Sequence, residues 1–258
     1  MQSIDIERFG EAPALLPMTY PGARPETSFF YTEGRVLTLE SDDPAGEARD
    51  WLHARDQAPL RSRIAVLCLG SNACPPQIHR KVGDRETGTI LFLRVRVRGV
   101  RPVYAGHVAR YGAIPATGDR ALEPQSLFLA LYTPEQLKAT ARSEGDSYDL
   151  SRLEDAEVTA GASFRVDRPY AFLARRGTLR LFAESGPVPL EDLGQEPLIR
   201  SLLKQTHLER TLSFESYASD PARYRQELES AIEEHGLRRP HRLRHRPIAL
   251  DQARPIPT

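Results

Sequence analysis

The feature that most constrains the fold is a run of six apolar residues, Ile64 to Leu69, that leads directly into Gly70-Ser71-Asn72. A run without polar alternation is typical of a strand buried on both faces, so we expect a central strand here. The pair Pro75-Pro76 fits the start of a short helix, which Gly83 would end. The Gly-Ser-Asn segment can be an ordinary turn between the two. Alternatively, its free backbone amides face one way and bind a carboxylate or a polarised carbonyl oxygen.

The rest of the chain predicts short strands and short helices. Alternating or clustered apolar residues predict strands at 28–32, 35–40, 89–106, 125–132, 170–175 and 178–183. Apolar residues at helical spacing, preceded by capping residues, predict helices at 43–56, 133–145, 196–212 and 220–236. Because strands outnumber helices in the middle of the chain and the helices are short, we expect an α+β barrel or sheet rather than a doubly wound fold.

The charge and cysteine content restrict the partners and the location. Basic and acidic side chains balance at 35 each, which argues against nucleic acid or an acidic membrane surface as the main partner. The start of the chain lacks the pattern of a signal peptide, and no segment has the roughly 20 apolar residues of a membrane span. With two cysteines, Cys68 and Cys74, a disulfide framework is not expected. We therefore expect a cytoplasmic protein.

Metal and thiol chemistry have little support in the sequence. His241 and His245 are four residues apart, but Pro240 argues against a helix, and no cysteine or carboxylate cluster supports them, so no metal site is predicted. Cys74 would be a nucleophile only if a histidine lay close to it. The basic tail has no interleaved aromatic residues, and we expect a solvated end rather than a nucleic-acid site.

The helix predicted for 133–145 has the best-defined ends. Thr133 is a suitable N-cap, Gln136 completes a capping box with it, and Pro134 fits the first helical position. Gly145 can end the helix in a left-handed conformation.

Glu144 stands in the last turn of this helix, on the same face as Leu137 and Ala141. It extends the apolar face, and the free carbonyls of the last turn make that end of the helix negative. Burial and the helix dipole both disfavour a carboxylate, so its presence there marks a candidate general base. The alternative is that Glu144 turns outward and pairs with an arginine such as Arg142 or Arg152.

Two motifs, CLGSNACPPQI and LFLALYTPEQLKATARSEGDSY, occur in an order and at a spacing that resemble the gamma-glutamylcyclotransferase-like superfamily. The resemblance covers about residues 63–182. It implies a small mixed β-barrel with short helices, in which the Gly-Ser-Asn loop and the glutamate face one cavity, and it implies no cofactor. It also implies that Glu144 is the catalytic acid and base, and that the substrate-binding residues include Gly70, Ser71, Asn72 and Tyr148.

The chain departs from that superfamily at Leu69, where the related loop usually begins with tyrosine. Leu69 is thus expected to line the substrate site without a hydroxyl or an aromatic wall, which puts the identity of the substrate in doubt. The matching core spans 61–185, between an N-terminal extension over 1–60 and a C-terminal extension of helices and basic tail over 186–258. These extensions are expected to cover the cavity, form a small module or contact another subunit.

The segment HVARYGAIPATG lies between the two motifs and contains the polar residues His107, Tyr111 and Thr117. The resemblance places a substrate-covering loop here, so Tyr111 is a candidate substrate contact. The alternative is a satisfied histidine and an aromatic side chain packed on the core.

The favoured hypothesis is an enzyme that cyclises a gamma-glutamyl amine or peptide to 5-oxoproline and releases the amine, with Glu144 as general acid and base. Its expected partner is this small-molecule substrate. One alternative is a non-catalytic ligand-binding or regulatory module on the same fold, which Leu69 and the long flanks favour. Another is an amide hydrolase that uses the same cavity.

Overall fold

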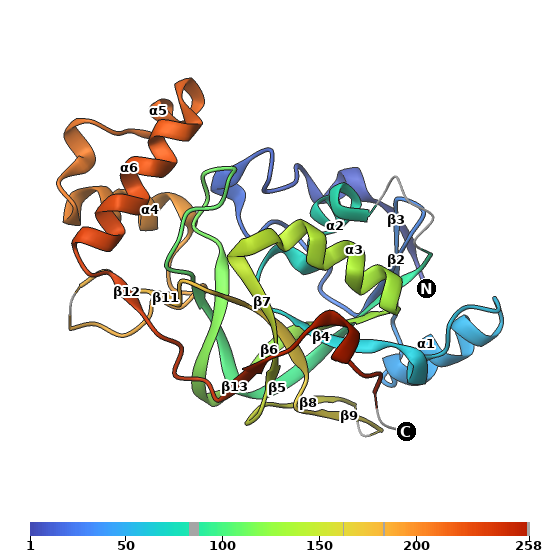
Figure 1. The fold of residues 1–258 in the computed structure, drawn as a ribbon. Coiled ribbons are helices and arrows are strands. Elements are labelled where there is room, and N and C mark those ends of the chain that lie inside the picture. Colours follow the sequence, from blue (N-terminus) through green and yellow to red (C-terminus); the bar gives the residue numbers. More distant parts are fainter. Residues whose placement is uncertain (83–87, 162, 183, 257–258) are drawn as a thin grey trace.

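The computed structural model describes residues 1–82, 88–161, 163–182 and 184–256, which form one large sheet with short helices around it (Figure 1). The strands of this sheet are β1 (Ser3–Asp5), β2 (Phe29–Thr32), β3 (Arg35–Thr38), β4 (Ile64–Cys68), β5 (Ile90–Tyr104), β6 (Ala116–Tyr132), β7 (Tyr148–Leu153), β8 (Glu157–Ala160), β9 (Phe164–Asp167), β10 (Tyr170–Ala174) and β13 (His245–Pro247). A separate pair consists of β11 (Thr178–Leu179) and β12 (Arg238–Arg239). The helices are α1 (Pro44–His53), α2 (Pro75–Val82), α3 (Pro134–Glu144), α4 (Gln195–Gln205), α5 (Phe214–Ser219) and α6 (Pro221–Glu234).

The sheet is mostly antiparallel and open. Its strand order is β1-β3-β2-β5-β6-β4-β10-β7-β13, with β8 attached to β5 and β9 attached to β8. Of the pairings between described strands, β4 with β10 is parallel and the others are antiparallel. The expected α+β class is therefore confirmed. No strand pairing between described residues joins the two edges of the sheet, so the expected closure into a barrel is not observed. The edge of β7 that closure would need is occupied by β13 from the tail.

β4 is the central strand that the apolar run predicts. β6 pairs with it on one side and β10 on the other, and all five of its residues are buried. Ala65 and Leu67 contribute to one hydrophobic core, which α1 covers. Ile64 and Val66 contribute to a second core, which α2 and α3 cover. The strand is apolar throughout because each of its faces lies against a core.

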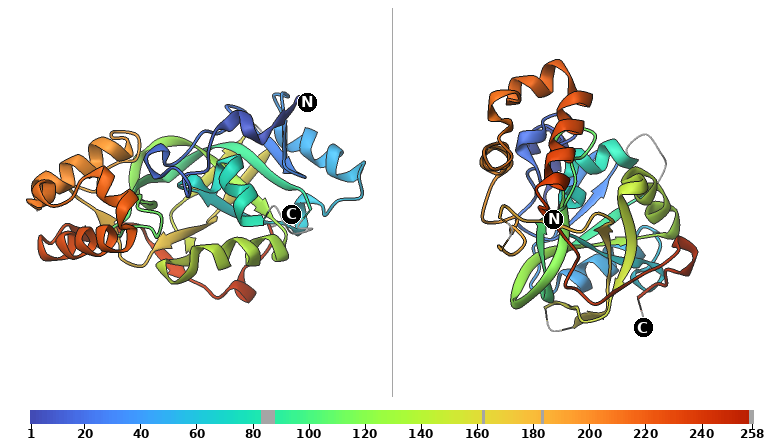
Figure 2. Two further views of the ribbon diagram at one scale, coloured as in Figure 1. Left: turned by 90° about the horizontal axis from the view of Figure 1, so that it is seen from above. Right: turned by 60° about the vertical axis from the view of Figure 1, so that its left-hand side comes forward.

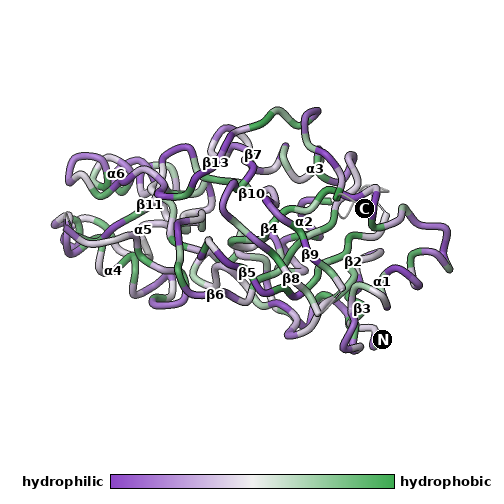
Figure 3. Tube along the Cα trace, turned by 90° about the horizontal axis from the view of Figure 1, so that it is seen from below, coloured by the Kyte–Doolittle hydropathy of each residue, from purple (hydrophilic) through white to green (hydrophobic). Residues whose placement is uncertain are grey.

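The C-terminal helices form a third core at one end of the molecule, opposite α1 (Figure 2). The apolar row that predicts α6, Tyr224, Leu228 and Ile232, is fully buried and packs with Tyr104 at the end of β5. In Figure 3, α1 and α6 show both hydrophilic and hydrophobic stretches, as expected for helices that bury one face only. None of the helices in the described part of the chain is long and apolar enough to cross a membrane.

The capping residues of α3 determine where it begins. Thr133 Oγ1 accepts the backbone N–H of Gln136, and the Gln136 side chain accepts the backbone N–H of Thr133. Gly145 ends the helix with a φ of 56° and a ψ of −147°, so φ is positive but the backbone is not in the predicted left-handed helical region. Gly83, the predicted end of α2, lies outside the described residues.

Several strands differ from the sequence prediction. β6 begins at Ala116, well before the predicted 125, and β11 ends at Leu179 instead of 183. β7, β8 and β9 were not predicted, because they are short and mix charged with apolar residues. β2 and β3 come from the expected N-terminal extension and β13 from the expected tail, so both extensions contribute strands to the sheet.

Leu129→Ala is expected to lower the free energy of unfolding by about 2–5 kcal/mol, because Leu129 is fully buried on β6 between Leu67 and Leu93. The matched control on the same strand is Leu122→Ala, whose side chain is 86% exposed and whose loss is expected to cost less than about 0.5 kcal/mol. Urea denaturation followed by circular dichroism measures both. Equal effects would contradict the assignment of Leu129 to the core.

Candidate active site

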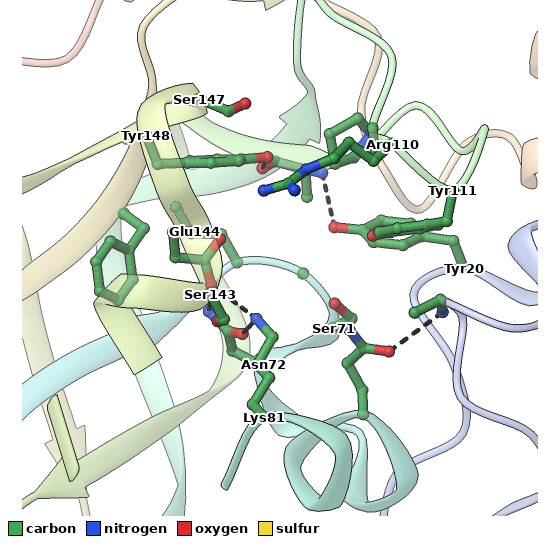
Figure 4. A pocket seen from close by; sticks show the side chains of 18 of the residues that line it. Tyr20, Ser71, Asn72, Lys81, Arg110, Tyr111, Ser143, Glu144, Ser147 and Tyr148 are labelled. Carbon is green, nitrogen blue, oxygen red and sulfur yellow. Dashed lines mark hydrogen bonds and ion pairs between the residues drawn. The ribbon is translucent and has the colours of Figure 1, made fainter. Parts of the chain in front are cut away.

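A cavity of about 470 Å³ lies where the end of β4, the helices α2 and α3 and the start of β6 meet (Figure 4). The structure brings all the candidate site residues from the sequence to its wall: Leu69, Gly70, Ser71, Asn72, Tyr111, Glu144 and Tyr148. Apolar side chains such as Leu67, Ala139 and Phe172 complete the wall. Much of the remaining lining is polar or charged, so the cavity is suited to a small molecule that carries polar or charged groups.

Asn72, Lys81 and Glu144 form a connected polar group on one wall, where Figure 4 shows them pointing toward one another. Asn72 Nδ2 donates to Glu144 Oε1 over 3.1 Å, and Lys81 Nζ donates to the same oxygen over 2.8 Å. Lys81 Nζ also donates to Asn72 Oδ1 over 2.6 Å. The side chains of Lys81 and Glu144 are only 13% and 12% exposed. The Gly-Ser-Asn loop and the glutamate therefore meet in one site.

Local structure explains why these side chains converge. The chain leaves β4 through a 3-10 turn at Ser71–Ala73, in which the backbone N–H of Cys74 donates to Ser71 O. α2 starts at Pro75 immediately afterwards and packs beside α3. Lys81 lies near the end of α2, four residues after the cavity residue Gln77, so both project from the same helical face. Glu144 is the last residue of α3.

The cation beside Glu144 is Lys81, which sequence reasoning missed, and not Arg142 or Arg152. Arg142 lines the cavity but forms no hydrogen bond or ion pair with Glu144, and Arg152 lines a different cavity near the C-terminal tail. The sequence did hold a hint that Lys81 has a special role, because it is one of only three lysines in an arginine-rich chain. An ammonium offers three donors from one small group, so it can reach both Asn72 and Glu144. Among the described residues Glu144 Oε2 has no such bond, which leaves it available to a ligand.

Tyr20, from the N-terminal arm, is a second site residue that the sequence did not reveal. Its Oη accepts the backbone N–H of Ala116 over 2.7 Å, and its side chain is 6% exposed. A Cβ on Gly70 would overlap this hydroxyl and lie 3.0 Å from the Cβ of Ala116. Gly70 is therefore needed for space and not for a positive φ, because its φ is −138°.

Leu69, where the resemblance expects tyrosine, is buried and belongs to the first hydrophobic core, so it only borders the cavity. Its Cδ1 lies 3.1 Å from the position that a Cβ on Gly118 would take. The aromatic hydroxyl beside the loop comes instead from Tyr20, which reaches the loop from a distant part of the chain.

Three tyrosines face the cavity close to Glu144. Burial raises the pKa of Tyr20, Tyr111 and Tyr148 well above the ordinary value, and the Glu144 charge raises each further. Backbone hydrogen bonds to Tyr20 act in the opposite direction but do not outweigh burial. Tyr148 Oη donates to Ala116 O over 2.9 Å. All three hydroxyls therefore stay neutral across the physiological pH range.

Other residues singled out from the sequence have different surroundings. His107 lines the cavity edge-on to Tyr148, and its Nδ1 is buried with no hydrogen-bond partner among the described residues, so it is not a satisfied core histidine. Thr117 is fully buried and accepts the backbone N–H of Ala174, a structural contact. Cys74 is buried next to Gly22, and burial raises the pKa of its thiol, which does not suit a thiolate nucleophile.

Comparisons of the chain with protein-family models, curated proteins and solved structures found no match. The described residues contain no group of three or more side chains suited to hold a metal ion. The ring nitrogens of His241 contact the backbone oxygens of Gly118 and Ala174.

Gly70→Ala is expected to destabilise the protein because the new Cβ displaces the Tyr20 hydroxyl. Tyr20→Phe removes that hydroxyl, so part of the clash disappears in the double variant. The two substitutions are therefore expected to be non-additive, with a coupling free energy of about 0.5–3 kcal/mol. Urea denaturation of the wild type, both single variants and the double variant measures this. Strict additivity would contradict the contact.

His107 is expected to make stability fall as the pH drops. Burial lowers its pKa from the ordinary histidine value of 6.5 to about 4, so the unfolded chain binds the extra proton first. Its contribution is lost as the pH falls from about 6.5 to about 4 and amounts to roughly 3 kcal/mol. His107→Phe should reduce the slope of the unfolding free energy against pH in this range. The control His53→Gln, on the exposed side of α1, should leave that slope unchanged. An unchanged slope in His107→Phe would refute the assignment.

Proposed function

We propose that this protein is an enzyme of the gamma-glutamylcyclotransferase type, with Glu144 as general acid and base. The observation that supports this most directly is that Asn72, from the loop after β4, and Lys81 both hold Glu144 Oε1 inside the cavity. A carboxylate fixed in place beside a loop with backbone N–H groups is suited to proton transfer at a carbonyl group.

In the proposed reaction the α-amine of the substrate attacks its own γ-carbonyl carbon, and Glu144 accepts a proton from the attacking nitrogen. The new C–N bond closes a five-membered ring while negative charge develops on the carbonyl oxygen. The C–N bond to the leaving amine then breaks, and Glu144 returns the proton to the leaving nitrogen. The products are 5-oxoproline and a free amine. Because the reaction is intramolecular, orientation in the cavity supplies much of the acceleration.

Neutral donors surround the proposed reacting group. The Tyr20 oxygen already accepts the Ala116 N–H, so its own proton can donate to the oxygen on which charge develops. Ser71 and Tyr111 line the same part of the cavity and bind the glutamyl end in this proposal, together with Gly70 and Asn72. Lys81 offsets negative charge near Glu144 throughout the reaction.

We also propose that the sheet is a variant of the small mixed barrel of that superfamily. What supports this is that five strands of the expected core, β5, β6, β4, β10 and β7, are neighbours in the strand order. The expected extensions add their strands outside this block: β1, β3 and β2 beside β5, and β13 beside β7. The proposal requires no cofactor. It also expects a cytoplasmic location, to which the two unpaired cysteines are suited.

A second candidate is a ligand-binding module without turnover, which the Lys81–Glu144 ion pair favours because it occupies one carboxylate oxygen. An amide hydrolase in the same cavity is distinguished by its product. It would release free glutamate instead of 5-oxoproline.

The test is to incubate the protein with a panel of γ-glutamyl dipeptides and to measure 5-oxoproline by liquid chromatography. Glu144→Gln is expected to lower kcat at least about 100-fold, because a positioned general acid and base contributes roughly that much. The matched control is Glu135→Gln on the first turn of the same helix, where the side chain is exposed, and it should retain full activity. Equal activity of Glu144→Gln and the wild type would remove Glu144 from the mechanism.

A further inference from the structure

Three arginines that have no partner in the described part of the chain lie around the cavity. Arg80 comes from α2, Arg142 from α3, and Arg110 from the segment between β5 and β6. All three are exposed, and none has an ion pair or hydrogen bond with any residue in the described ranges. Some exposed arginines elsewhere are paired, as Arg35 is with Asp5, and others, such as Arg49, have no partner among the described residues. What distinguishes these three is that they lie together around one cavity.

The charges of the cavity wall do not balance. Glu144 is the single acidic residue on the described wall, and Lys81 already neutralises it. The three arginines therefore add three positive charges that the wall does not offset, although the whole chain has a formal net charge of zero. A cleft with one sign of charge concentrates ligands of the opposite sign.

Arg110 lies beside the proposed reacting group. Figure 4 shows it reaching into the cavity on the side opposite Asn72 and Lys81. One of its guanidinium nitrogens lies 3.6 Å from the position of a Cβ on Gly145, the residue that follows Glu144. A planar guanidinium binds a carboxylate with two parallel hydrogen bonds, so Arg110 is placed to hold a carboxylate of the leaving group.

We infer, on the basis of the proposed function, that the leaving group is an acidic amino acid, so that the substrate is a γ-glutamyl glutamate or aspartate. The glutamyl end of any such substrate has one carboxylate, and an acidic leaving residue adds two more. This total of three matches the three arginines that have no partner among the described residues. A leaving amine without charge would leave most of these cations unmatched.

The test compares γ-glutamyl-glutamate with γ-glutamyl-glutamine, which has the same length and one negative charge fewer. The value of kcat/KM for 5-oxoproline release is expected to be about tenfold higher for the glutamate compound. Raising NaCl from about 0.05 M to about 0.5 M should reduce this ratio, because salt screens exposed charges. Arg110→Gln should also reduce the ratio, and the exposed α1 control Arg49→Gln should leave it unchanged.

A binding measurement separates this inference from the proposed function. Isothermal titration calorimetry of both dipeptides with the wild type and with Glu144→Gln reports the preference without turnover. Cyclisation of both compounds with equal efficiency would overturn the inference and leave the proposed function standing. Equal binding of both compounds without 5-oxoproline would overturn both. Preferential binding of the glutamate compound without 5-oxoproline would support the acidic ligand and overturn the enzyme. Binding of neither compound would overturn both.

Discussion

The burial of β4 on both faces is the constraint on which the rest of the structure depends. Its residues alternate between two hydrophobic cores, so the strand must lie inside the sheet, with β6 and β10 beside it. The loop after Cys68 therefore lies in the middle of the molecule and not at its edge. α2 and α3 cover the same core, so their cavity-facing residues, Lys81 and Glu144, arrive beside that loop.

Asn72, Lys81 and Glu144 are largely buried, and the low dielectric of this environment strengthens the electrostatic interactions between them. A largely buried carboxylate needs compensation, and here one ammonium and one amide supply it at the same oxygen. Removing Lys81 would leave the Glu144 carboxylate without its ion-pair partner, whereas the arrangement as it stands keeps the second oxygen open to the cavity. A site of this kind combines rigid placement with a free acceptor, which is what proton transfer to and from a ligand requires.

The N-terminal arm is part of the site. Tyr20 places its hydroxyl against Gly70 and Ala116, in the region where the resemblance expects a tyrosine at position 69. Leu69 packs into the first hydrophobic core. The site is thus built from two segments that are far apart in sequence.

The sequence by itself determined the central strand at 64–68, the capped helix that ends at Glu144, and the candidacy of the Gly-Ser-Asn loop with that glutamate. These features rest on apolar periodicity and on hydrogen bonds between residues three or four positions apart, which a short stretch of sequence is enough to predict. Only the tertiary structure decided that Lys81 is the partner of Glu144, that Tyr20 stands against Gly70, and that the sheet remains open. Each of these depends on contacts between residues 50 or more positions apart (Tyr20 and Gly70, 70 − 20 = 50), or on short edge strands such as β13, and no local spacing specifies them.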